Sequence, residues 1–159
     1  MKSIAVFTLA AMFTLTSCAI DGPPITAAKS EKNINKEAMA NFANEFKNAS
    51  DVTWDKEEDF SFAHFILGNE RLVAAYDETG KHISTSRFIE FSELPLAVTL
   101  NVKERFPEAV KIGRVAEVVF DNYASYYFTI VTKKQVLRIK SSADGYINVM
   151  ERQKILNQK

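Results

Sequence analysis

Cysteine is nearly missing from this chain, because Cys18 is the single one in 159 residues. A lone cysteine has no partner for a disulfide, so the fold must be held together by its apolar core. Histidine occurs only at His64 and His82, which leaves few side chains for acid–base catalysis or metal ligation. Twelve Phe and five Tyr supply large side chains for a core.

An excess of charge of either sign is also missing, because 20 Lys and Arg balance 20 Asp and Glu. That balance disfavours nucleic acid and anionic surfaces as partners, and we expect no nucleic-acid partner. A membrane-spanning run is missing as well. The apolar stretch over residues 4–15 is shorter than the ~20 residues that a bilayer requires.

The N-terminus carries the pattern of a bacterial secretion signal. Lys2 precedes the apolar stretch, which ends in Leu15-Thr16-Ser17-Cys18. Small residues directly before a cysteine are typical of the lipobox of bacterial lipoproteins. We therefore expect residues 1–17 to be a removed signal peptide and Cys18 to carry lipid. The chain would be secreted across the inner membrane and become a periplasmic or outer-membrane-anchored lipoprotein, in contact with the membrane through this lipid. The alternative is an ordinary cleaved signal with a cysteine nearby.

The rest of the chain divides into a tether, one domain and a short tail. Residues 18–32 are small, polar or turn-forming, which predicts a flexible tether, and residues 153–159 form a C-terminal tail. In the domain, residues 33–152, two apolar stripes at helical spacing predict amphipathic helices. The first covers residues 34–47, and the second follows Ser92 as its N-cap and ends at Pro107.

After each predicted helix, the apolar period changes to that of strands. Short turns between the strands indicate antiparallel pairing, because parallel strands need long crossovers. The predicted strands cover residues 60–67, 72–76, 82–87, 112–120, 123–132, 135–140 and 146–150.

The two halves of the domain resemble each other. Phe46-x-x-Ala49-x-x-Val52 recurs 60 residues later as Phe106-x-x-Ala109-x-x-Ile112. We predict an α+β fold of two tandem helix-plus-antiparallel-sheet repeats, residues 33–88 and 89–152, with both helices on one face of the sheet. Chance similarity of two amphipathic αβ segments is the alternative.

Four motifs follow one another within about residues 39–150. They are Phe46-x-x-Ala49-x-x-Val52-x-Trp54, Ala75-Tyr76-Asp77-Glu78-Thr79-Gly80, Glu93-Leu94-Pro95 and Phe106-Pro107. Their order and spacing resemble the PepSY-like, β-lactamase-inhibitor-like family, common among secreted and lipid-anchored proteins of Bacteroidetes-type bacteria. The resemblance implies a tandem αβ fold whose sheet presents a curved surface, as in the β-lactamase inhibitory protein, and a binding role in place of a catalytic one.

Chemistry-bearing patterns are weak in this chain. His64 and His82 lack a nucleophile elbow or metal-ligand spacing, so we predict no catalytic residue, metal or cofactor. The acidic residues within 55–59 could attract calcium but lack the spacing of an EF-hand, which favours a solvated hairpin turn. Lys133, Lys134, Arg138 and Lys140 form a basic strip, which we interpret as a charged sheet edge, with an anion site as the alternative.

Aromatic residues give the best candidate for a binding surface. Trp54 is expected in the core. In one strand, Tyr123 and Tyr127 share a face while Tyr126 and Phe128 share the other, so one pair points away from the helices. Those four residues are the candidate partner-binding surface, and Tyr126 with Phe128 is the pair whose double substitution by alanine serves as the control for partner binding. Stabilisation of cross-strand pairs is the alternative role.

Together these patterns predict a non-catalytic cell-envelope lipoprotein that binds a protein or peptide, with modulation of a secreted hydrolase as one form of that role. A structural or small-ligand-binding envelope lipoprotein is the alternative.

Overall fold

The structure is a computed structural model that describes residues 34–155. The predicted signal peptide, the lipid attachment at Cys18 and the tether lie outside the described residues, as do residues 156–159. The described elements are, in chain order, α1 (Lys36–Glu45), β1 (Ala49–Glu57), β2 (Phe60–Leu67), β3 (Glu70–Tyr76), β4 (His82–Ile89), the 3-10 turn η1 (Phe91–Glu93), α2 (Leu96–Arg105), β5 (Lys111–Ile112), β6 (Val115–Phe120), β7 (Tyr123–Val131), β8 (Gln135–Ser142) and β9 (Ile147–Lys154).

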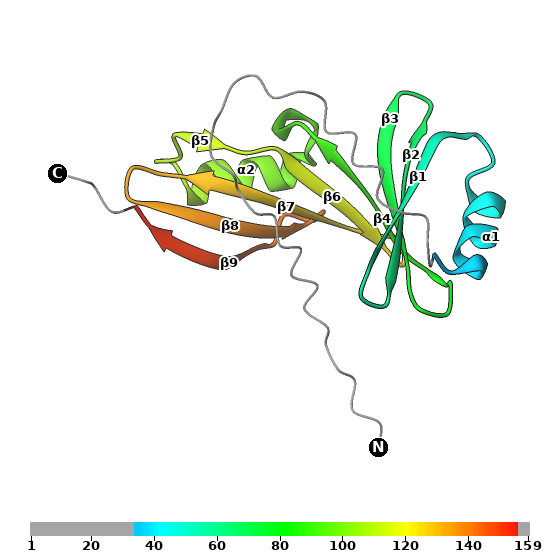
Figure 1. Cartoon of the computed structure of the whole chain (residues 1–159). Helices are drawn as coiled ribbons and strands as arrows, with labels where there is room; N and C mark the ends of the chain where they lie inside the picture. Colours follow the sequence, from blue (N-terminus) through cyan, green and yellow to red (C-terminus); the bar gives the residue numbers. More distant parts are fainter. Residues whose placement is uncertain (1–33, 156–159) are drawn as a thin grey trace, which may run out of the picture.

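The strands form one antiparallel sheet, as the short turns predicted (Figure 1). Its order is β1-β2-β3-β4-β6-β7-β8-β9, and the short β5 pairs with β7. Strand β4 pairs directly with β6, so the sheet runs without a break from the first helical half to the second. We call α1 with β1–β4 the N-terminal unit, and η1 and α2 with β5–β9 the C-terminal unit.

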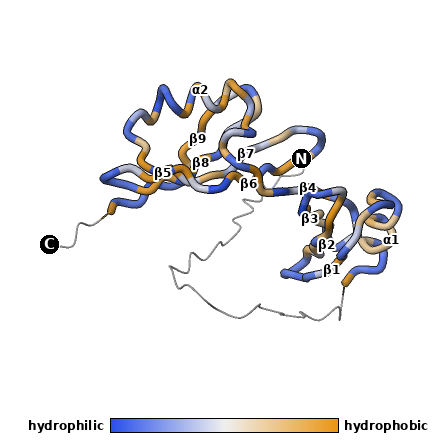
Figure 2. Tube along the Cα trace, turned by 90° about the horizontal axis from the view of Figure 1, so that it is seen from above, coloured by the Kyte–Doolittle hydropathy of each residue, from blue (hydrophilic) through white to orange (hydrophobic). Residues whose placement is uncertain are grey.

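Both helices cover the same face of the sheet. Directly paired residues in an antiparallel sheet point to the same side. One row of pairs links the two cores, because Phe65 in the N-terminal core is joined by successive pairs to Tyr126 in the C-terminal core. The sheet bends between the units, with α1 and α2 on the outside of the bend (Figure 2). The predicted α+β arrangement of helices on a sheet is therefore present.

Each helix packs over its own core. The N-terminal core consists of Ala38, Phe42, Trp54, Ala63, Phe65, Ala74 and Tyr76. The C-terminal core consists of Ile89, Leu94, Val98, Val102, Phe106, Val115, Tyr126, Phe128, Ile130, Leu137, Ile139 and Ile147. Trp54, with 6% of its surface exposed, lies in the core as predicted. Burial of these side chains supplies the main stabilisation of a fold for which no disulfide is available.

A turn glycine meets each helix through the same contact. Asn41 in α1 donates its side-chain amide to the Gly80 carbonyl at 2.8 Å, and Asn101 in α2 donates to the Gly145 carbonyl at 2.9 Å. Both glycines have positive φ, +82° and +92°. An added Cβ would come within 2.6 Å of Glu37 at Gly80 and within 2.7 Å of Asn101 at Gly145, so neither turn has room for a side chain.

Three sequence expectations were wrong in detail. Strand β1 was not predicted, because Trp54 is its only buried residue and the acidic residues after it suggested a turn. Ser92 does not cap the second helix. It lies in η1, and Pro95 is the N-cap of α2. The single strand expected over residues 112–120 is divided into β5 and β6 by Gly113 and Arg114.

Candidate functional site

The face of the sheet that carries no helix is the candidate binding surface, and we call it the helix-free face. Register assigns Phe62, Ser84, Phe120 and Tyr123 to one row on it, because each pairs with the next or with a shared partner. Large apolar side chains are open to solvent here: Phe88 is 47% exposed, Phe120 50% and Tyr123 79%. Exposed aromatic side chains on a continuous sheet face are typical of binding surfaces.

Only half of the predicted aromatic cluster belongs to this surface. Tyr126 and Phe128 are each only 5% exposed and pack in the C-terminal core beneath α2, so including them in a partner-binding surface was wrong. Tyr123 and Tyr127, at alternating positions of β7, lie on the helix-free face. Alternation identified the two pairs correctly, but the position of α2 decides which pair is covered.

The basic strip is also placed differently from its prediction. Strand β8, which carries Arg138 and Lys140, pairs with both β7 and β9 and is therefore not a sheet edge. Lys140 lies over the Tyr127 ring, with Nζ 5.5 Å from the ring centroid. Arg138 pairs with Glu151 at 3.3 Å. The interpretation as a charged edge was wrong, because β8 has a strand on each side; Arg138 and Lys140 alternate onto the helix-free face.

The predicted acidic turn is shorter than expected. Asp55 and Glu57 belong to β1, and only Glu58 and Asp59 form the turn. Asp55 pairs with His64 of β2, with Oδ2 3.2 Å from Nε2. Within residues 34–155, no group of three or more His, Cys, Asp or Glu side chains is arranged to hold a metal ion.

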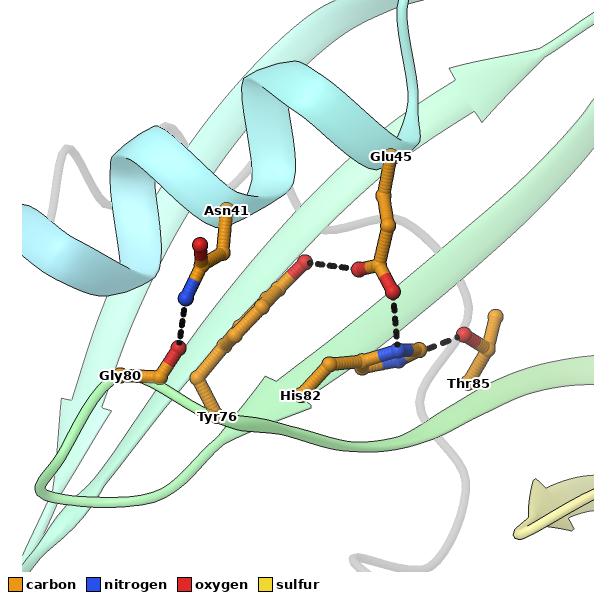
Figure 3. A network of polar contacts seen from close by, with 6 residues as sticks. All are labelled: Asn41, Glu45, Tyr76, Gly80, His82 and Thr85. Carbon is orange, nitrogen blue, oxygen red and sulfur yellow. Dashed lines mark hydrogen bonds and ion pairs between the residues drawn. The ribbon is translucent and has the colours of Figure 1, made fainter.

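A second polar arrangement lies beneath the end of α1 (Figure 3). His82 Nδ1 lies 3.1 Å from Glu45 Oε1, and His82 Nε2 lies 3.0 Å from the Thr85 hydroxyl. Tyr76 donates its hydroxyl to Glu45 Oε2 at 3.3 Å. An open cavity of about 550 Å³ adjoins the network and is lined by Asn41, Asn44, Glu45, Thr79, Lys81 and His82.

The contacts run from the Thr85 hydroxyl through His82 to Glu45, which is the order of nucleophile, base and orienting carboxylate in a catalytic triad. Here, however, the imidazole packs on Tyr76, with ring centroids 5.2 Å apart, and the hydroxyl belongs to a residue within strand β4. Burial, the charge of Glu45 and its hydrogen bond all raise the pKa of Tyr76, so the phenol stays protonated as a donor. We interpret the network as a clamp between α1 and the sheet. No local sequence pattern indicates this network, because Glu45 and His82 are distant in the chain.

A groove lies on the helix-bearing face where the two units meet, with a volume of about 260 Å³. The cation among its lining residues is Arg87, whose Nε donates to Glu117 Oε2 at 2.6 Å. That hydrogen bond raises the pKa of Arg87, and burial raises the pKa of Tyr126 beside the pair. The groove is lined by Leu67, Glu70, Leu72, Thr85, Ser86, Arg87, Glu117 and Val119.

Neither helix of the described residues 34–155 has the length and apolar character needed to cross a membrane.

Solved structures with the same architecture come from Bacteroides species. No family model matches the sequence, and no curated protein does. A DUF2874 family protein of Bacteroides uniformis aligns with a TM-score of 0.66 at 15% identity, covering 76% of this chain and 89% of that chain. A BLIP-like protein of Bacteroides fragilis aligns with a TM-score of 0.63 at 14% identity, covering 79% and 89%.

A third structure, a Bacteroides eggerthii protein that has been proposed to be periplasmic, aligns with a TM-score of 0.64 at 15% identity, covering 79% of this chain and 91% of that one. These identities are low, so the likeness concerns the fold. The chain has the fold of the BLIP-like and DUF2874 proteins of Bacteroides.

Proposed function

We propose that this protein is a non-catalytic binding module of the bacterial cell envelope and that its helix-free face binds a protein or peptide partner. The observation that carries the proposal is the exposure of Phe88, Phe120 and Tyr123 on the inner side of the bent sheet. Exposed aromatic side chains bury large areas at low entropic cost when a partner covers them. A secreted hydrolase is one class of partner that would make the protein a modulator.

The envelope location is supported by the secretion pattern that ends at Cys18 and by the proposed periplasmic location of the Bacteroides eggerthii protein with this fold. In this proposal Cys18 carries lipid and holds the domain at a membrane. The matched contacts of Asn41 with Gly80 and of Asn101 with Gly145 support an origin of the two units by duplication. They agree with the resemblance to the PepSY-like family.

Site-directed photo-crosslinking tests the binding face. A crosslinking residue is placed at Tyr123 in one sample and at Leu96 in the other, in intact cells that make the full chain. Both side chains are similarly exposed, 79% and 71%, but Leu96 begins α2, which covers the opposite face of the sheet. We expect discrete crosslinked proteins from position 123 and none from position 96. They should disappear when excess wild-type protein competes.

The control competitor is the double variant Phe120→Ala/Tyr123→Ala, which removes two paired exposed rings without touching either core. It should fail to compete. Equal crosslinking from both positions, or full competition by the double variant, would exclude the helix-free face as the binding site.

A small ligand in the groove between the units is the second candidate function. The groove of about 260 Å³ combines apolar Leu67 and Leu72 with the Arg87–Glu117 pair, which suits a small molecule with an apolar part and a polar end. Thermal stabilisation of the protein by such a molecule, abolished by Leu72→Arg while crosslinking from position 123 is unchanged, would favour this role.

A further inference from the structure

The charges on the helix-free face are separated along the sheet. Among the described strand residues, its carboxylates lie on the two edge strands, with Asp55 and Glu57 on β1 and Glu151 on β9. The cations lie between these edges. By register and by ring contact, they are Arg71, Lys111, Arg114, Arg138 and Lys140. Asp55 already faces His64, and Glu151 already faces Arg138. The carboxylates of this face are therefore largely engaged, while the centre is cationic.

Two of these cations lie on aromatic rings of the same cross-strand row. Pairing places Phe88, Ala116, Tyr127 and Lys140 in one line across β4, β6, β7 and β8. Arg114 lies over Phe88, with Cζ 4.7 Å from the ring centroid, and Lys140 lies over Tyr127 at 5.5 Å. Neither cation forms an ion pair with a carboxylate within residues 34–155. Cation–π contact orients a cation without neutralising it.

We propose that the partner of the helix-free face presents an acidic segment, which lies across β4, β6, β7 and β8 with its carboxylates on Arg114 and Lys140. The inference rests on the proposed binding function and adds the chemical class of the partner. Phe88 and Tyr127 are two strand spacings apart, about 10 Å, which an extended segment of a few residues spans. The carboxylates meet cations that the rings already hold in place, and apolar atoms of the same segment cover Phe120 and Tyr123.

Charge favours this partner over a second copy of the chain. The helix-free face lies on the inner side of the bend (Figure 2), so a second copy would meet it with its own inner face, and the cationic centres of the two copies would repel each other. The same cations disfavour a basic partner. An acidic segment satisfies both the shape and the charge.

The test is fluorescence anisotropy of the full chain with two short labelled peptides. One is rich in glutamate with a tyrosine at each end, and the other has glutamine in place of each glutamate. We expect the wild-type protein to bind the glutamate peptide about tenfold more tightly, a difference of about 1.4 kcal/mol. The preference should shrink as salt is raised, because exposed charges are screened. The double variant Arg114→Glu/Lys140→Glu should lose the preference.

The matched control is Lys47→Glu/Lys103→Glu, which changes the net charge by the same amount at exposed positions in the turn after α1 and within α2. It should keep the preference. Equal affinity of the wild-type protein for both peptides, or retained preference in Arg114→Glu/Lys140→Glu, would overturn the proposal of an acidic partner. Crosslinking from position 123 that persists in such a case would leave the binding function standing. Loss of that crosslinking would remove both proposals.

Discussion

The N-terminal unit fills the space beneath α1 mainly with aromatic rings, whereas the C-terminal unit fills the corresponding space beneath α2 mainly with aliphatic side chains. Phe42 in α1 has ring centroids of Phe65 at 5.0 Å and Trp54 at 5.5 Å. The corresponding residue of α2, 60 positions later, is Val102, which is 1% exposed. Around it the core is completed mainly by Val, Ile and Leu.

The outer frame of the two units nevertheless agrees. Each helix ends at a phenylalanine C-cap, Phe46 or Phe106, whose carbonyl accepts a hydrogen bond from the amide of an alanine three residues on. Each helix is also held to a glycine turn by an asparagine side chain. The comparison shows that the two units share a backbone contact at the helix C-cap and a side-chain contact from the middle of the helix, while the interior accepts different packing solutions of adequate volume.

Truncation of the two equivalent helix residues gives the largest contrast. We expect Phe42→Ala to lower the free energy of unfolding by about 4 kcal/mol and Val102→Ala by about 2 kcal/mol, because the cost follows the volume of the cavity left behind. Urea denaturation of both variants measures the difference. Equal losses would show that the two side chains contribute equally to the free energy of unfolding despite their different volumes.

The glycine turns should respond alike and nearly as strongly. Gly80→Ala and Gly145→Ala combine a positive φ with a Cβ forced against the helix, at 2.6 Å from Glu37 and 2.7 Å from Asn101 respectively. Each should cost about 3 kcal/mol, since strain in the left-handed region adds to overpacking. The measurement is again urea denaturation.

Gly68 provides the control for these glycines. It also has positive φ, +63°, but nothing lies within 4 Å of an added Cβ. Gly68→Ala should therefore cost only about 1 kcal/mol, from backbone strain alone. If Gly80→Ala matched Gly68→Ala while Gly145→Ala did not, the helix-to-turn contact would be important in only one unit.

The features that local sequence predicts are the ones that both units share. Both helices followed from apolar stripes at the helical period, and most strands followed from alternation between turn signals. Strand β1 was not predicted, because it is an edge strand with one buried residue, Trp54, and its sequence therefore shows no alternation of apolar and polar residues. The start of α2 was misplaced because η1 forms its own capping box between Glu90 and Glu93 ahead of Pro95.

The candidate surface was predicted only in part, for a reason of tertiary structure. Alternation separates Tyr123 and Tyr127 from Tyr126 and Phe128, but it carries no information about which side α2 covers. The covered side follows from the row of strand pairs that joins Tyr126 to the N-terminal core residue Phe65. Likewise, the cation–π contact of Arg114 with Phe88 depends on the pairing of β4 with β6, which no local pattern reveals.

The smallest contrast concerns the two buried phenols at alkaline pH. Burial and the neighbouring Glu45 raise the pKa of Tyr76 above its ordinary value of about 10. Above that pH the unfolded chain loses the proton while the folded protein keeps it, so the stabilisation present below pH 10 is lost as pH rises. The loss can reach about 1.4 kcal/mol per pH unit. Tyr76→Phe should remove this part of the alkaline decline, measured by urea denaturation between neutral and alkaline pH.

Tyr126 of the C-terminal core is the internal comparison for this effect. Burial and Glu117 raise its pKa too, but the positive charge of Arg87 opposes the shift. Tyr126→Phe should therefore flatten the alkaline decline less than Tyr76→Phe does. A larger effect at Tyr126 would mean that Arg87 does not offset Glu117 at the junction of the units. Protonation of Tyr126 would then contribute more to the pH dependence of unfolding than protonation of Tyr76 in the clamp with Glu45 and His82.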